Sequence, residues 1–252
     1  MRFSGAIVRR PGPDLAAGIT SAGLGSPSFE LACRQHDAYV AALRDAGLEV
    51  EVLEALPGYP DAYFVEDVAV MLGDVAVISR PGAEARRGEA RAIEPALAAR
   101  IPIARIDAPG TLDGGDVLIV GGRAFIGISG RTNRAGAEQL GALLARRGYR
   151  WSAVPLAAGL HLKSSVNAVA EDVLLVAEGL PVAPFAGFRL LEVPTSESYA
   201  ANSLRINERV LMPRGFPRTR EALESVSAEV RELDVSEPRK MDGGLTCMSL
   251  RF

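Results

Sequence analysis

Paired apolar runs separated by short polar turns recur along this chain, and each pair is followed by a helical pattern. FVEDVAVMLGDVAVISRPGAEARRGEARAIEPAL and GGDVLIVGGRAFIGISGRTNRAGAEQLGALLA share this order, as do SVNAVAEDVLLVAEG and SLRINERVLMPRGFPRTREALESV. Two apolar runs joined by a Gly-Asp, Gly-Gly, Glu-Asp or Asn-Glu pair predict a β-hairpin. The turns fall near residues 74, 122, 172 and 208, a spacing of about 36–50 residues that is typical of repeat architectures.

The two ends of the chain supply the parts of a fifth unit. CMSLRF predicts one strand and FSGAIVRR its neighbour, with a helix over FELACRQHDAYVAALRDAGLEV. We therefore expect residues 1–252 to form a single α/β domain of five ββαβ-type repeats, closed into a ring around a central channel by the C-terminal strand. The alternative is an open α/β sheet whose hairpins resemble one another by accident.

Composition excludes several classes of function. The net charge is −3, which gives no basic excess for binding nucleic acid or an anionic membrane surface. The N-terminal residues lack the long apolar run of a signal peptide, and no stretch has the length of a membrane span. Two cysteines and two histidines, at 33, 36, 161 and 247, do not have zinc-ligand spacing, so we expect neither a metal nor a cofactor. The cysteine count favours a reducing cytoplasm.

Residues suited to catalysis occur at equivalent positions of successive repeats. FVED contains Glu66 and Asp67, LDGGD contains Asp113 and Asp116, LHLKSS contains His161, and LTC contains Cys247. A thiol, an imidazole and a carboxylate are the groups needed for a cysteine nucleophile with an oriented acid/base. Taken singly, each has an ordinary structural explanation: a buried small apolar thiol, a structural histidine, or an aspartate in a glycine turn. Their shared position in the repeats favours a common site.

The same residues indicate what the site binds. Several carboxylates near one channel repel each other unless a cation lies among them, and a planar guanidinium matches carboxylates best. Arg86 and Arg131 follow two of the hairpins and would suit a carboxylate at the other end of the ligand, although each could also be a solvated arginine at a helix start. Together these residues favour an arginine derivative.

Long segments of the chain resemble the dimethylarginine dimethylaminohydrolases, which belong to the pentein superfamily of five-fold α/β-propellers. They are FVEDVAV, ISRPGAEARRGE, LDGGDVLIVG, GRTNRAGAEQL, HLKSSVNAV, SYAANS and DGGLTCMSLRF, in order from the first strand to the last residue. The resemblance implies hydrolysis of Nω-methylated arginines to citrulline and methylamine or dimethylamine, without a cofactor.

The resemblance also implies roles for individual residues. Cys247 corresponds to the nucleophile, His161 to the general acid/base, and Asp113 to the acid that orients the histidine. The expected substrate-binding residues are Glu66 and Asp67 for the guanidinium, Phe64 for the pocket wall, Arg86 and Arg131 for the α-carboxylate, and Asp61, the backbone of Ile19 and the carbonyl of Met241 for contacts near the α-amino end. Residues 10–27, rich in glycine and small residues, would form a mobile lid.

Other functions fit parts of the pattern. An arginine deiminase usually has aspartate two residues after the histidine, where this chain has Lys163, and an amidino-transferring enzyme would use the same scaffold. A non-catalytic arginine-binding protein would not need Cys247, His161 and Asp113 together. A redox sensor would need a resolving partner for Cys33, and none is evident. The expected partner is a small-molecule substrate, and a homodimer would be compatible with an apolar edge helix.

Overall fold

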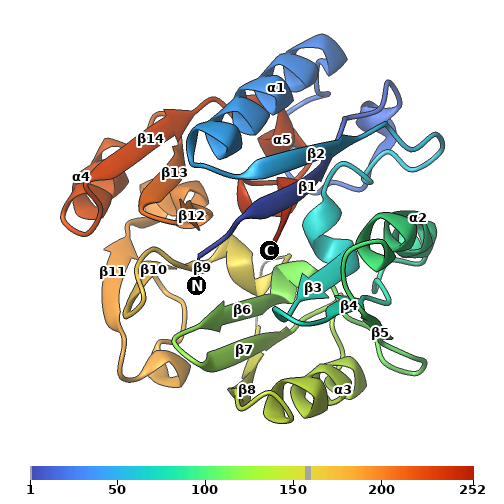
Figure 1. The fold of residues 1–252 in the computed structure, drawn as a ribbon. Coiled ribbons are helices and arrows are strands. Elements are labelled where there is room, and N and C mark those ends of the chain that lie inside the picture. The colour runs from blue at the N-terminus through green and yellow to red at the C-terminus, as the bar shows by residue number, and fades with distance from the viewer. Residues whose placement is uncertain (1, 157–159) are drawn as a thin grey trace.

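In the computed structural model, which describes residues 2–156 and 160–252, five three-stranded sheets are arranged around a common centre (Figure 1). The sheets are β15–β1–β2, β3–β4–β5, β6–β7–β8, β9–β10–β11 and β12–β13–β14. Their strands span Gly5–Arg9 (β1), Glu49–Leu53 (β2), Ala69–Met71 (β3), Ala76–Ile78 (β4), Ile103–Arg105 (β5), Val117–Val120 (β6), Arg123–Ile128 (β7), Arg150–Pro155 (β8), Val166–Ala168 (β9), Val173–Ala177 (β10), Arg189–Val193 (β11), Leu204–Ile206 (β12), Arg209–Pro213 (β13), Glu229–Leu233 (β14) and Leu250–Arg251 (β15).

Each sheet has the same internal topology. The middle strand pairs antiparallel with the inner strand of its hairpin and parallel with a third strand reached by a crossover, as β4 does with β3 and β5. The tight turn between β6 and β7 uses Gly121 and Gly122, both with positive φ, as a two-residue hairpin turn requires. This arrangement confirms the predicted five-fold α/β-propeller of ββαβ repeats and excludes the open sheet.

Helices form four of the five crossovers, on the outside of the ring (Figure 1). They are α1 (Phe29–Asp45), α2 (Arg87–Ala98), α3 (Arg134–Ala145) and α4 (Pro217–Glu224), and a short helix α5 (Ser236–Lys240) follows β14. Side chains of Ser28 and Asn133 cap α1 and α3 by accepting backbone N–H groups of the first turn. The expectation of a helix after every hairpin is wrong for the fourth unit, where only a 3-10 turn (Ala183–Phe185) connects β10 to β11. Two prolines and two glycines within GLPVAPFAG prevent a longer helix there.

The ring closes by pairing the two ends of the chain. β15 lies antiparallel to β1 with Ile7 opposite Leu250, and the carbonyl of Phe252 accepts the N–H groups of Ser4 and Gly5. Leu250 is buried with Ile7 and with Val65 and Val68 of the next unit. Apolar packing between neighbouring units therefore continues across the point of closure, as the sequence predicted.

A 3-10 turn precedes the inner strand of every unit and positions the functional residues. These turns are η2 (Val65–Val68), η4 (Gly114–Asp116), η5 (Leu162–Ser164), η7 (Thr195–Ala201) and η8 (Thr246–Met248). η8 contacts η2, η2 contacts η4, η4 contacts η5, and η5 contacts η7. The five turns thus form one layer at one end of the channel. Within the described residues, no helix is long and apolar enough to span a membrane.

Replacing Leu250 with alanine tests how much the closure contributes to stability. Leu250 is 3% exposed, so Leu250→Ala is expected to lower the free energy of unfolding by about 2–5 kcal/mol through lost burial and a residual cavity. Leu24, 50% exposed, provides the same substitution at the surface, and Leu24→Ala is expected to change it by less than about 0.5 kcal/mol. Urea unfolding measures both, and equal losses would contradict a closed ring.

Candidate active site

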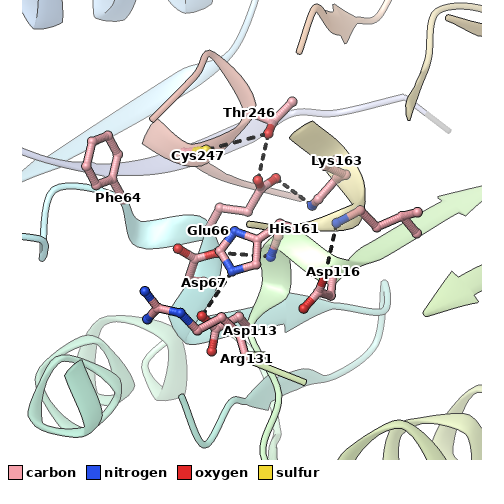
Figure 2. A network of polar contacts seen from close by, with 12 residues as sticks. Phe64, Glu66, Asp67, Asp113, Asp116, Arg131, His161, Lys163, Thr246 and Cys247 are labelled. Atoms are coloured by element: carbon pink, nitrogen blue, oxygen red, sulfur yellow. Dashed lines mark hydrogen bonds and ion pairs between the residues drawn. The ribbon is translucent and has the colours of Figure 1, made fainter. Parts of the chain in front are cut away.

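A cavity of about 20 Å³ lies where the layer of turns meets residues 10–27, and it contains the predicted catalytic residues. Asp67 from η2, His161 at the start of η5 and Cys247 from η8 line it, and Asp113 at the start of η4 lies behind His161 (Figure 2). Each of these residues comes from a different repeat. The cavity is smaller than an amino acid, so the structure corresponds to a closed site.

His161 is held between two carboxylates. Its Nε2 lies 3.0 Å from Asp113 Oδ2, and its Nδ1 lies 3.8 Å from Asp67 Oδ1. The other oxygen of Asp113 accepts the N–H of Gly82 at 2.9 Å, which fixes the carboxylate. A Cβ on Gly115 would lie 2.6 Å from Nδ1, so only glycine permits this approach. These contacts orient the imidazole toward the cavity.

The charges around His161 favour its protonated form. Burial alone would lower its pKa, but Asp67, the hydrogen bond to Asp113, and Asp116 together raise the pKa to about 9. Burial likewise disfavours the charged form of Asp67, yet His161 and Arg86 lower its pKa to about 2. At neutral pH the site therefore contains an imidazolium beside a carboxylate, an arrangement able to donate a proton.

Asp116, which the sequence grouped with the other carboxylates, supports the turn that carries His161. Its Oδ1 accepts the N–H of Leu162 at 2.9 Å, and its Oδ2 accepts the hydroxyl of Ser129 at 2.7 Å. Asp116 is fully buried and does not line the small cavity.

Arg86 lines the cavity but is already engaged by protein groups. It donates to Asp67 Oδ2 at 2.6 Å, to both oxygens of Glu89, and to the carbonyls of Asp61 and Phe64. Arg86 is also 5% exposed. In this state it orients and neutralises Asp67, and the predicted contact of Arg86 with a substrate carboxylate stays a prediction.

The cysteine is held in its neutral form when the site is empty. Shielding from solvent, with the charges of Glu66 and Asp67 adding to it, raises the pKa of Cys247 to about 12. Its Sγ accepts the N–H of Gly244 at 3.4 Å, which offsets only part of this effect. A bound cation is therefore needed to stabilise the thiolate at neutral pH.

Glu66 does not lie where the sequence placed it. Its carboxylate turns away from the small cavity toward Lys163 and Thr246 (Figure 2), and it contacts Lys163 Nζ at 2.7 Å, Arg251 Nη2 at 2.9 Å and Thr246 Oγ1 at 2.7 Å. These side chains line the central channel, a cavity of about 730 Å³ on the other side of the turns. Successive residues on a turn point in different directions, so Glu66 and Asp67 serve different cavities. The structure does not support Glu66 as a guanidinium ligand.

The other predicted binding residues line the small cavity. They are Ile19, Asp61, Phe64, Arg131 and Met241. Asp61 accepts the N–H of Ile19 with both oxygens, at 3.1 Å each. Among the described residues, no hydrogen bond or ion pair engages the guanidinium of Arg131, which leaves this group available to an anion.

Residues 10–27, the predicted lid, are fastened over the cavity by two carboxylates. Besides the contact of Ile19 with Asp61, Thr20 and Ser21 donate to Asp242 Oδ2, the latter through its backbone N–H at 2.5 Å and its hydroxyl at 3.0 Å. Asp242 was not singled out from the sequence. The covering of the cavity by this segment agrees with a lid, and its movement stays a prediction.

Sequence reasoning also missed Asn202. It follows η7, the fifth turn, and joins η5 to η8: its amide donates to the carbonyl of Lys163 at 3.1 Å and accepts the N–H of Thr246 at 3.0 Å. The signal was present in SYAANS, a polar residue at the position where the other four repeats have theirs.

Asp67, Asp113 and His161 have ligand atoms within 4.8 Å of one another, a spacing that a metal ion could use. The groups already have opposite charges and pair with each other, and Arg86 adds a further positive charge at Asp67. A divalent cation would have to displace a proton and lie near that guanidinium. We therefore assign no metal ligands.

Comparison with known proteins identifies the family. A sequence model described as N,N dimethylarginine dimethylhydrolase, eukaryotic, matches residues 27–180. The N(G),N(G)-dimethylarginine dimethylaminohydrolase of Pseudomonas aeruginosa is 44% identical, over 99% of this chain and 100% of the relative. The chain belongs to the dimethylarginine dimethylaminohydrolase family. The enzyme of the same name from Streptomyces coelicolor is 41% identical, over 98% of this chain and 96% of the relative.

Solved structures agree with this family assignment. A Cys-to-Ser mutant of the Pseudomonas aeruginosa enzyme, complexed with citrulline, superposes with a TM-score of 0.97 at 43% identity over the full length of both chains. A dimethylarginine dimethylaminohydrolase with His replaced by Gly, in an adduct with S-methyl-L-thiocitrulline, gives a TM-score of 0.96 at 43% identity, covering 99% of this chain and 100% of the other. The N-terminal domain of an arginine dihydrolase, ArgZ, shares the fold at 18% identity with a TM-score of 0.89, covering 98% of this chain and 97% of the other.

The protonation of His161 can be tested directly, because the chain has only two histidines. We expect one imidazole to titrate with a pKa of about 9 (His161) and the other, desolvated His36, with a pKa of about 4. Asp113→Asn removes a charge beside His161 and is expected to lower the pKa of His161 while leaving that of His36 unchanged. NMR titration of the imidazole carbons measures both, and an unshifted His161 would contradict the role of Asp113.

Proposed function

We propose that this protein hydrolyses Nω-methylated arginines, asymmetric dimethylarginine and monomethylarginine, to L-citrulline and dimethylamine or methylamine. The observation that carries the proposal is the shared cavity of Cys247, His161 and Asp67, with the unengaged guanidinium of Arg131 in the same wall. A thiol, a proton donor and a carboxylate suit a guanidinium carbon under attack, and Arg131 suits a carboxylate at the other end of the substrate.

Substrate binding would prepare the nucleophile. The guanidinium lies against Asp67, and its positive charge, enclosed by Phe64 and by the lid, lowers the pKa of the Cys247 thiol from its high value in the empty site. The proton leaves to solvent before the lid closes. Asp67 is suited to this contact because Arg86 and the N–H of Gly115 fix its carboxylate.

The first chemical step forms a covalent intermediate. The Cys247 thiolate attacks the guanidinium carbon, and His161, protonated and held by Asp113, donates its proton to the departing amine. The carbon–nitrogen bond breaks, and an S-alkylthiouronium remains on Cys247.

Hydrolysis then reverses the role of His161. Its neutral imidazole takes a proton from the attacking water, the carbon–sulfur bond breaks, and citrulline leaves as the Cys247 thiolate is regenerated. Because the closed cavity is smaller than an amino acid, residues 10–27 have to move for the substrate to enter and the product to leave.

The setting of the enzyme follows from the same chemistry. A catalytic thiol is preserved in a reducing compartment, and both cysteines are free, so we place the protein in the cytoplasm. Residues 1–252 act as one catalytic domain, because each catalytic residue comes from a different repeat. Pairing into a homodimer is part of the proposal and is measurable by sedimentation.

The alternative, hydrolysis of unmethylated arginine, has less support in this site. Lys163, which occupies the position where arginine deiminases have aspartate, contacts Glu66 and lines the central channel rather than the small cavity. No carboxylate from this position is available to a second guanidinium nitrogen.

A product assay tests the proposal. Asymmetric dimethylarginine is expected to give citrulline and dimethylamine in equal amounts, and L-arginine and agmatine little or no product. Cys247→Ser is expected to reduce turnover by a factor of about 10³ or more, whereas Cys33→Ser, which changes the other cysteine, retains it. Ammonia and citrulline from L-arginine would instead identify a deiminase, and binding without product would identify a binding protein.

A further inference from the structure

Glu66 is a buried carboxylate, adjacent to Asp67, that the reaction above does not use. It is 3% exposed and has three partners: Lys163, Arg251 and Thr246. A buried carboxylate with two cations and a hydroxyl is costly to assemble unless all partners are held in place. Such a group strongly constrains the backbone segments that supply its partners.

Those segments are the turns of the active site. Glu66 itself is in η2 beside Asp67, Lys163 is in η5 two residues after His161, and Thr246 is in η8 directly before Cys247. The three contacts of the carboxylate are between 2.7 and 2.9 Å long. One carboxylate therefore joins the three turns that carry the guanidinium ligand, the acid/base and the nucleophile.

We propose that Glu66 is a positioning residue, whose bonds to Lys163 and Thr246 hold Asp67, His161 and Cys247 in register across three repeats. The inference rests on the proposed function. It replaces the sequence-based assignment of Glu66 to the substrate, because its carboxylate lies on the channel side of the turns. Asn202 reinforces the same junction from the fifth turn, through Lys163 and Thr246.

Position and charge have opposite consequences here, which makes the proposal testable. The groups around the Cys247 thiol include Glu66 and Asp67 from η2, His161 and Lys163 from η5, and the phenols of Tyr39, Tyr63 and Tyr199. Glu66 raises the pKa of Cys247 and Lys163 lowers it. Removing the negative charge of Glu66 would therefore produce more thiolate, and a purely electrostatic role predicts faster turnover at neutral pH. A positioning role predicts slower turnover despite the additional thiolate.

The experiment compares Glu66→Gln with Glu197→Gln in a Cys33→Ser background, so that Cys247 is the one thiol. Glu197 is a matched control: it is a buried glutamate in η7, and it accepts a threonine hydroxyl, that of Thr219, at 2.7 Å. The pKa of Cys247 is read from the pH dependence of thiolate absorbance and of alkylation by iodoacetamide. Turnover of asymmetric dimethylarginine gives kcat and KM.

We expect Glu66→Gln to lower the pKa of Cys247 by about one unit and kcat by about tenfold or more, with KM changed less than about threefold. Glu197→Gln is expected to leave all three values within about twofold of the background. A higher kcat in Glu66→Gln would overturn the positioning role in favour of charge alone, and an unchanged kcat and pKa would overturn any role.

Lys163→Met keeps the proposal testable if Glu66→Gln does not fold. It breaks the same link from η5, and we expect a raised pKa of Cys247 and a kcat lowered by about tenfold. Because both variants break one connection, the double variant is expected to lose no more activity than the weaker single variant. Unchanged kcat in Lys163→Met, or losses that multiply in the double variant, would overturn the proposal.

The proposed function can fail separately. Absence of wild-type turnover on any methylated arginine would contradict the hydrolase assignment, whereas the direction of the Cys247 pKa shifts is measured without substrate. Opposite shifts in Glu66→Gln and Lys163→Met would still support the link from Glu66 to the cysteine turn, and absent shifts would overturn it.

Discussion

Buried negative charge at the meeting point of the repeats is the constraint on which the rest of this structure depends. Glu66, Asp67 and Asp113 are each at most 3% exposed, and each has a dedicated positive or hydrogen-bonding partner. Carboxylates this deeply buried stay ionised only when such partners are fixed nearby. The turns, and the strands that follow them, are arranged so that every one of these partners comes from a neighbouring repeat.

Adjacent residues separate two tasks. Asp67 is paired with Arg86 and His161 and faces the small cavity, whereas Glu66 is paired with Lys163 and Arg251 and faces the channel. This arrangement raises the pKa of both His161 and Cys247, so the empty site contains a proton donor but no thiolate. The nucleophile therefore depends on a cationic substrate. Such dependence also protects the thiol from unrelated electrophiles, because the thiolate is the reactive form.

The sequence predicted the architecture well because the signals were local and repeated. Hairpin turns such as Gly121-Gly122 and the pairing of the last strand with the first are encoded by short-range pattern, and the resemblance to the dimethylarginine dimethylaminohydrolases supplied the family. The sequence could not show which way a side chain points from a 3-10 turn. Glu66 and Asp67 are neighbours in FVED, yet only the three-dimensional positions of Lys163 and Thr246, far along the chain, assign Glu66 to the channel. For the same reason the engagement of Arg86 by Glu89 and the contact of the lid with Asp242 were not predicted.

The central claim is that Cys247 forms a bond to the guanidinium carbon during turnover. The most direct measurement is rapid mixing with asymmetric dimethylarginine, acid quenching within one turnover, and mass spectrometry of the intact protein and its peptides. The account predicts one covalent adduct per chain, on the peptide that contains Cys247, with dimethylamine released at the same rate as the adduct forms. Product formed without any adduct on this peptide, or an adduct on Cys33, would contradict it.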